Sequence, residues 1–252
     1  MHPITPPEDR THMAKPSKDK DRRAVAAELR KQQERAEKRR TRAILGAVVV
    51  VALVIIGLGA YPLIRQEQVA GGDLEEIGAA AGAANCQEVV KKSAEGQNDH
   101  REIGSEVVYQ EAPPAFGPHY PQTAGFNRKF YSPSDRQDLE YYVHNLEHGY
   151  NLLWYDETIA DNADQLAAVK AIASKFEGDE LTDKFIALPW TEEDGKAFPD
   201  GAHVALTHWY ANPETLEDQE GVWMYCDAPS GEVVSDFVED YPYTDSPEPN
   251  AM

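Results

Sequence analysis

Cysteine is scarce in this chain, which has only two, Cys86 and Cys226, among its 252 residues. They lie far apart, so no C-x-x-C pair exists, and thioredoxin-like redox chemistry has no support in the sequence. No serine sits in a G-x-S-x-G turn, and no glycine-rich phosphate loop is present. Acyl transfer and nucleotide binding therefore lack their usual motifs.

Basic residues are also scarce over most of the chain, which carries a formal net charge of −20. Up to Arg42 there are thirteen Lys and Arg against seven Asp and Glu, a net of +6. The remaining eleven basic and thirty-seven acidic residues give a net of −26. So acidic a surface repels nucleic acid, and binding to DNA or RNA is not expected.

Between the basic and acidic parts lies a long run without charge, residues 43–64, AILGAVVVVALVIIGLGAYPLI. As a helix, its 22 residues span roughly 33 Å, enough to cross the hydrocarbon core of a bilayer. A cleaved signal peptide has a shorter leader and an apolar stretch of roughly 7–15 residues. The small residues that follow, IGAAAGAAN, keep cleavage open as an alternative.

The orientation of this predicted transmembrane helix follows from its flanks. Four basic residues lie between Lys38 and Arg42, whereas only Arg65 follows the other end. The positive-inside rule then places the N-terminus in the cytoplasm and the acidic part outside. We therefore expect a single-pass plasma-membrane protein, with the lipid bilayer as one partner and an extracytoplasmic C-terminal domain.

The expected organisation has five parts. Residues 1–42 form a basic cytoplasmic leader, with helical spacing from residue 19 onward. The sequence from Met13, MAKPSKDKDRR, already has a leader pattern, which leaves translation from Met1 or from Met13 open. The transmembrane helix, residues 43–64, is followed by a Gly- and Ala-rich linker, residues 65–85. The extracytoplasmic domain is predicted over residues 86–243, and the tail, residues 244–252, is expected to be disordered.

Within the domain, apolar patterns alternate between helical and strand-like periods. Helices are predicted over residues 134–149, 161–178 and 230–241, and strands over 106–109, 150–155, 184–190 and 203–210. The Pro- and Gly-rich residues 111–126 are expected to form a loop. Helices interspersed with strands indicate an α+β fold, an α/β sandwich in which helices pack on a mixed sheet.

Outside the cell, Cys86 and Cys226 are expected to pair, because thiols oxidise there. Such a disulfide closes a loop of 140 residues and contributes about 4–5 kcal/mol on the chain-entropy model. The alternative is that Cys226, near Met224, is a soft ligand for copper.

The strongest functional pattern is YYVHNLEHGYNLLWY, residues 141–155. In the predicted helix an apolar stripe is formed by Leu139, Tyr142, Val143 and Leu146. His144 and His148 share a face that points away from this stripe. Because they point away from the stripe, these histidines are either solvated or covered by another part of the chain. Histidines four residues apart can both reach one metal ion.

Two further histidines lie upstream. His119 sits between prolines and tyrosine in FGPHYP, where proline restricts the backbone and so the direction of the ring. His100 lies in GQNDHREIG. If the loop folds over the helix, His100, His119, His144 and His148 form a metal site that suits copper or zinc. Tyr120 and Glu147 would then orient the imidazoles.

The same helix fits the H-x-x-E-H pattern of inverted zinc peptidases. In that interpretation His144 and His148 bind zinc, Glu147 activates water, and Glu177 or Glu180 is the third ligand. His203 and His208 lie in a strand and point to opposite faces, so they cannot both serve one site. Both are predicted to be surface residues. The tryptophans of the domain are predicted to fill its core.

Two segments together resemble a known family: YQEAPPAFGPHYPQTAGF, residues 109–126, and YYVHNLEHGYNLLWY, residues 141–155. They are similar to the bacterial domain-of-unknown-function family 3105, and the likeness extends to Gly96, His100, IALPW and VALTHWY. The chain departs from the family pattern at Phe116, Tyr150 and Asn151. The resemblance implies a basic leader, one membrane span and an exported domain, and it implies no activity.

The sequence thus predicts an anchored domain that binds one transition-metal ion, copper in preference to zinc. A membrane-anchored interaction domain without metal, docking to a cell-envelope protein complex, is the alternative. A zinc hydrolase built on His144, Glu147 and His148 is the third hypothesis.

Overall fold

The computed structural model describes the backbone of residues 18–70 and 72–251, without the side chains of residues 18–21, 24, 57–70 and 200. The choice between Met1 and Met13 as the start lies outside the described residues. The chain divides into two units, residues 1–62 and residues 63–252.

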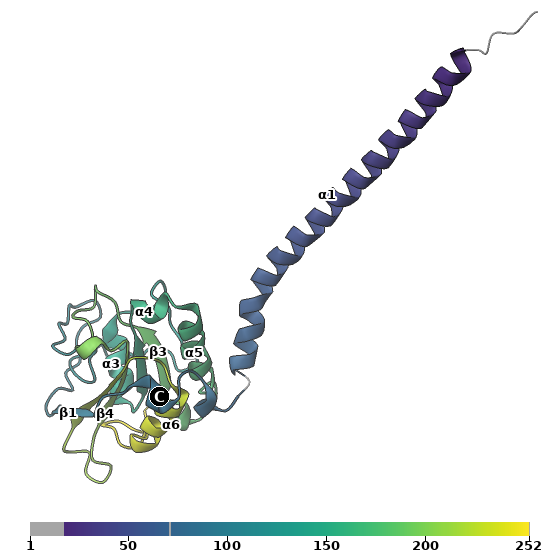
Figure 1. Ribbon diagram of the computed structural model, residues 1–252. Helices are drawn as coiled ribbons and strands as arrows, with labels where there is room; N and C mark the ends of the chain where they lie inside the picture. The colour runs from purple at the N-terminus through teal and green to yellow at the C-terminus, as the bar shows by residue number, and fades with distance from the viewer. Residues whose placement is uncertain (1–17, 71, 252) are drawn as a thin grey trace, which may run out of the picture. The chain divides into compact units, whose positions relative to one another are not determined.

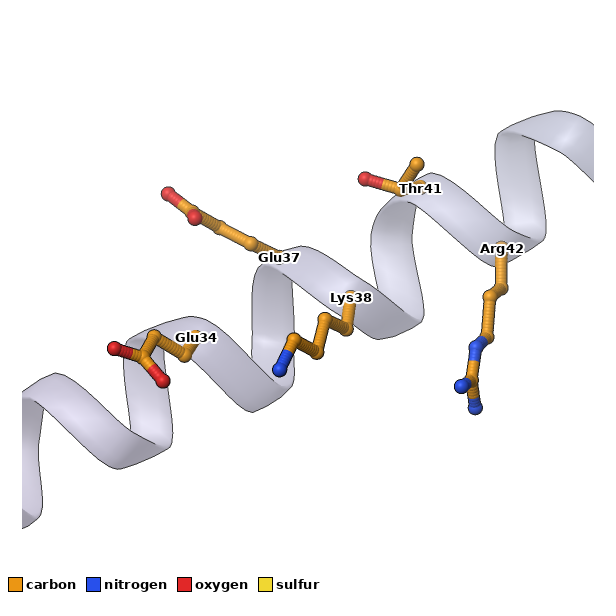
Figure 2. Close-up of a pocket in the computed structure, with 5 residues that line it drawn as sticks. All are labelled: Glu34, Glu37, Lys38, Thr41 and Arg42. Atoms are coloured by element: carbon orange, nitrogen blue, oxygen red, sulfur yellow. The ribbon is translucent and has the colours of Figure 1, made fainter.

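The described part of the first unit belongs to one helix, α1 (Lys18–Ala70). It contains the helix predicted from residue 19 onward and the uncharged run, residues 43–64. Figure 2 shows Lys38 and Arg42 extending from one side of this helix and Glu37 and Thr41 from the other. These side chains are exposed, and they follow the helical spacing expected from residue 19 onward.

Within the described residues, no helix combines the length and the apolar character needed to cross a membrane. Residues 57–64 of the predicted span belong to the part of α1 whose side chains are not described.

The second unit is built on a five-stranded mixed sheet (Figure 1). Its strands are β1 (Val90–Ser93), β2 (Asn151–Tyr155), β3 (Phe185–Pro189), β4 (Val204–Tyr210) and β5 (Glu220–Cys226). They lie in the order β1-β5-β4-β2-β3. Only β2 and β3 pair in parallel, and the other neighbours are antiparallel. The α+β prediction is confirmed.

Both faces of the central strands are buried, because successive side chains of a strand point to opposite sides. In β2, Leu153 and Tyr155 pack into one apolar cluster, whereas Leu152 and Trp154 pack into the other. A strand that is covered on both faces has a continuous apolar sequence, and β2 shows this pattern in LLWY, residues 152–155.

Helices cover both faces of this sheet (Figure 1). They are η1 (Leu74–Glu76), α2 (Ala81–Ala84), α3 (Leu139–Glu147), α4 (Glu157–Ala160), α5 (Ala163–Ser174), η2 (Leu181–Asp183), η3 (Pro199–Gly201) and α6 (Gly231–Asp240). α5 and α6 pack on one face, and α3 packs on the other. The predicted apolar stripe of α3 is buried, with Leu139 half-buried at its start.

Some predicted elements differ from the observed ones. α3 starts after Asp138 rather than at Ser134. Residues 106–109, predicted as a strand, pair with no strand of the sheet. β1 has four exposed residues, VKKS, and therefore shows no apolar alternation. β5 was also not among the predicted strands, although its last five residues, VWMYC, are apolar.

The segments at both ends of the domain are ordered parts of it. Within the predicted linker, Ile77 and Ala84 are buried in the core. In the tail that was expected to be disordered, Ser246 is buried and the amide of Ala211 donates to the Asp245 carbonyl at 3.1 Å. Backbone hydrogen bonds and buried contacts supply the order that composition alone does not indicate.

Cys86 and Cys226 form a disulfide across a sequence separation of 140 residues. The predicted pairing is confirmed, and the alternative in which Cys226 is a copper ligand is excluded in this oxidised form. The bridge joins the segment before β1 to the end of β5, so β1 and the inner strands lie inside a covalent loop.

Replacing both cysteines by serine should lower the free energy of unfolding by about 4–5 kcal/mol, because a loop of this length is then free in the unfolded chain. All four tryptophans lie in this domain, so their fluorescence during urea unfolding of the full chain reports its stability. The wild-type chain under reducing conditions is the matched control and should unfold at the same midpoint as the variant. Equal stability of the variant and the oxidised wild type would contradict the prediction.

His208 was predicted to be a surface residue, and this prediction was wrong. Its side chain is fully buried, and its Nε2 lies 3.0 Å from the carbonyl oxygen of Asp245, to which it donates. Burial lowers the pKa of the His208 imidazole to about 4. The tail covers this ring, and no signal in the strand pattern showed that a tail would do so. His203, in contrast, is half-buried and lies 2.7 Å from the carboxylate of Asp156.

The burial of His208 predicts a loss of stability in mild acid. Unfolded, the imidazole binds a proton below about pH 6.5, whereas in the folded domain it does so only below about pH 4. The unfolded state therefore binds more protons in this window, and stability falls as the pH drops through it, by on the order of 3 kcal/mol. His208→Gln keeps a donor for Asp245 without titrating, so its urea midpoint should fall less between pH 7 and pH 4.5. An equal fall in both proteins would contradict this assignment.

Candidate metal centre

Helix α3 and its C-cap carry three polar side chains that lie outside the apolar stripe: His144, Glu147 and His148. The helix stops here because Gly149 adopts a φ of +89°, and a Cβ at this position would lie 2.3 Å from the Tyr243 carbonyl oxygen. All three polar side chains are nevertheless buried. They are covered by other parts of the chain, which is one of the two arrangements predicted.

The cover is the Pro-rich loop, residues 112–120, which is held by aromatic side chains of the sheet and by Tyr109. The Trp223 indole donates to the Pro113 carbonyl at 2.7 Å, and the Tyr109 hydroxyl donates to the Pro118 carbonyl at 2.8 Å. Phe116 packs between Trp209 and Trp223. Side chains of β4 and β5, together with Tyr109, thus hold the loop that carries His119.

A short backbone pairing brings His100 to this loop. The amide of Arg101 donates to the carbonyl of His119 at 2.7 Å, and the amide of His119 donates to the carbonyl of Asp99 at 3.1 Å. The two residues are aligned in parallel, and their ring centroids lie 4.7 Å apart. This pairing places the two loop imidazoles side by side over α3.

Four side chains therefore converge: His100, His119, His144 and Glu147. Their potential ligand atoms all lie within 4.8 Å of one another. From Oε2 of Glu147, the Nε2 atoms of His119, His144 and His100 lie at 2.9, 3.8 and 3.9 Å respectively. The Glu147 side chain is only 2% exposed, whereas that of His100 is 46% exposed. The cluster is thus buried on the α3 side and reachable from solvent at His100.

The contact between His119 and Glu147 brings two hydrogen-bond acceptors together. Nδ1 of His119 lies 2.8 Å from the Gly117 carbonyl oxygen, which only accepts, so Nδ1 carries a proton. In the neutral ring, Nε2 then presents a lone pair to the Glu147 carboxylate oxygen 2.9 Å away. Two acceptors at this distance repel unless a proton or a cation lies between them.

Electrostatics keep this carboxylate charged. Burial raises the pKa of Glu147, but the adjacent His119 ring, the hydrogen bond from Asn98 and the neighbouring His144 outweigh burial and lower it to about 2. Burial, together with the neighbouring His148 and His119, lowers the pKa of His144 to about 4. At neutral pH the cluster thus contains a carboxylate and a neutral His144 imidazole, the forms that bind metal ions.

Two asparagines position the cluster, and neither was predicted from the sequence. Asn98 donates to Oε1 of Glu147 at 2.7 Å and so turns Oε2 toward the imidazoles. Asn145, fully buried on α3, accepts from the Ala124 amide at 2.9 Å and donates to its carbonyl at 3.1 Å. The only available signal was their position, because each lies within two residues of a candidate histidine.

Three of the predicted residues lie differently from what the sequence indicated. His148 is not among the four converging side chains, and its Nε2 instead lies 3.4 Å from Oε2 of Glu248. The Tyr120 hydroxyl donates to the Ser105 carbonyl rather than to an imidazole. Glu147 lies among the potential ligands, whereas the H-x-x-E-H hypothesis needs it to activate water beside His144 and His148. Glu177 and Glu180 belong to neither described group of potential ligands.

The dimensions of the cluster suit a metal ion. Ligand atoms about 2.0–2.1 Å from a tetrahedral zinc ion lie roughly 3.3–3.4 Å from one another. The three distances from Glu147 Oε2, between 2.9 and 3.9 Å, bracket this value. These distances are compatible with three imidazoles and one carboxylate around one ion.

The fold and the cluster define an α+β domain with a buried group of potential metal ligands. The chain belongs to the family described as Protein of unknown function (DUF3105), whose model matches residues 100–252. The resemblance inferred from the two histidine motifs is thereby confirmed, and the match includes all four converging side chains. A comparison with curated proteins and with solved structures found no match.

Replacing Asn145 by alanine should destabilise the domain by about 2–4 kcal/mol, because it leaves the buried amide and carbonyl of Ala124 without their partner. Urea unfolding of the full chain, followed by tryptophan fluorescence, measures the change. Asn212→Ala is the matched control: it removes an exposed hydrogen bond to the Glu214 amide and should change stability by no more than about 0.5 kcal/mol. Equal effects of the two substitutions would show that Asn145 does not tie the loop to α3.

Proposed function

We propose that the domain binds a divalent transition-metal ion through His100, His119, His144 and Glu147. The observation that carries the proposal is the buried approach of the His119 Nε2 lone pair to the Glu147 carboxylate, which an ion between them would turn into two favourable contacts. The hydrogen bond from Asn98 to the carboxylate supports it, because metal-binding groups are usually oriented in this way by a second partner.

The donor set narrows the choice of metal. Imidazole and carboxylate ligands suit divalent zinc and copper(II), whereas copper(I) favours thiolate and thioether ligands. Cys226 is held in the disulfide, which leaves no thiolate at the site. We therefore propose copper(II) or zinc, and retain copper as the first candidate to test because the site is rich in imidazole.

The location of the site is part of the proposal. The uncharged run of residues 43–64 and the basic residues before it support a single membrane span with a cytoplasmic N-terminus. The metal site would then lie on the outer side of the plasma membrane, consistent with an oxidised cysteine pair. There the domain would hold a metal ion or deliver it to a cell-envelope protein complex.

Metal titration of the full chain in detergent tests the site. After chelation, the wild-type protein should bind a first equivalent of zinc or copper(II) tightly. His119→Gln and His144→Gln should each lower its affinity at least about a hundredfold, since even partners of metal ligands contribute 10–100-fold. Asn98→Ala should lower the affinity by about 10–100-fold, because Asn98 orients a ligand rather than binding the ion.

The matched control is His203→Gln, which removes a histidine that pairs with Asp156 outside the cluster. Its affinity should equal that of the wild type. Urea unfolding gives a second readout, because an ion at 100 times its Kd stabilises the folded state by about 2.7 kcal/mol. A wild-type chain that binds neither metal above the level of the double variant His119→Gln with His144→Gln would refute the proposal and favour the interaction domain.

A further inference from the structure

A second group of potential ligands lies beside the first and shares Glu147 with it. It consists of Glu147, His148 and Glu248, whose ligand atoms lie within 4.8 Å of one another. Nε2 of His148 is 3.4 Å from Oε2 of Glu248. Because His144 and His148 are four residues apart on α3, their rings are neighbours, with centroids 4.4 Å apart. The two groups are therefore contiguous.

The tail holds Glu248 firmly, although its side chain is 51% exposed. The amide of Glu248 donates to the carbonyl of Glu147 itself at 2.9 Å. On one side of Glu248, the Asp245 carbonyl accepts a hydrogen bond from His208. The absence of a side chain at Gly149 lets the tail backbone pass against the end of α3. The segment is thus anchored next to His148 by its backbone.

On the other side of Glu248, Lys184 fastens the tail. Its buried ammonium donates to the carbonyls of His148, Pro249 and Ala251 at 2.7–2.8 Å. Burying an ammonium is costly unless it is paired or hydrogen-bonded. The three carbonyls provide that compensation, and in doing so they join the end of α3 to the tail. Lys184 therefore positions Glu248 relative to His148.

We propose that the domain binds a second divalent cation at Glu147, His148 and Glu248, adjacent to the first, so that the Glu147 carboxylate serves both ions. This inference rests on the proposed function, since it extends the same centre. The second group offers two carboxylates and one imidazole, a more oxygen-rich set that suits zinc or manganese. Bridged pairs of this kind hold their ions about 3.5–4 Å apart.

Metal stoichiometry of the full chain in detergent tests the second position, with zinc as the probe. The wild type should bind two equivalents, and Glu248→Gln should bind one. Glu239→Gln is the matched control, because it makes the same change at an exposed glutamate of α6 and should keep both. Lys184→Met, which releases the tail without burying a charge, should also lose only the second equivalent.

Copper(II) gives a second readout, because magnetic coupling reports the distance between the two ions rather than only their number. Two copper(II) ions this close couple magnetically, so the paramagnetic resonance signal of the doubly loaded wild type should be weakened and broadened. The Glu248→Gln protein should instead show the signal of an isolated ion.

The outcomes separate the two proposals. If the wild type binds one equivalent of zinc and Glu248→Gln also binds one, the second site is refuted and the first is retained. His148 and Glu248 would then form only an ion pair. Two equivalents that persist in Glu248→Gln also overturn it, because the second ion then binds elsewhere on the acidic surface. No bound metal in the wild type overturns both proposals.

Discussion

The approach of the His119 imidazole to the Glu147 carboxylate, shielded from water, is the constraint around which the domain is arranged. A buried carboxylate is costly unless hydrogen bonds or opposite charge compensate it. Here Asn98 from the preceding segment donates to one carboxylate oxygen, and His119 from the Pro-rich loop and His144 from α3 place their rings around the other. Each of these segments must fold into place before the carboxylate is enclosed.

The sheet makes this convergence possible because both of its faces are covered. The aromatic side chains of β5 do more than fill the core, since Trp223 and Tyr225 also donate hydrogen bonds to the backbone carbonyls of Pro113 and Ala112 in the loop. Gly221 leaves the space that Phe116 occupies, since a Cβ there would lie 2.2 Å from its ring. The bulky ring of Phe116, where the chain departs from the family pattern, is thereby matched by a missing side chain opposite.

Much of this arrangement was predictable from local patterns. The period of the apolar residues indicated α3, α5 and the three strands β2, β3 and β4, and the count and setting of the cysteines indicated the disulfide. The meeting of His100, His119 and His144 was predicted from loop stiffness and the two histidine motifs. The family match then agreed with the resemblance carried by those motifs.

What could not be predicted depends on contacts between distant segments. The burial of His208 and the order of the tail arise from single hydrogen bonds to Asp245 and from Lys184, and composition does not record such bonds. The place of Glu147 as a potential ligand, and the separation of His148 from the first group, depend on how the loop tilts over α3. Helical spacing specifies only that these side chains share a face.

The disulfide also determines how the domain would respond to a mechanical load. A pull transmitted along the chain from residue 72 reaches Cys86 and passes through the covalent bridge to Cys226 at the end of β5. Strands β1 to β4, the Pro-rich loop and α3 all lie within the bridged loop and bear none of that tension along their backbone. Tension from this end would break the contacts made by Leu74 to Ala84 and would then act on the disulfide. It would therefore not stretch the backbone of the segments that carry the histidine cluster.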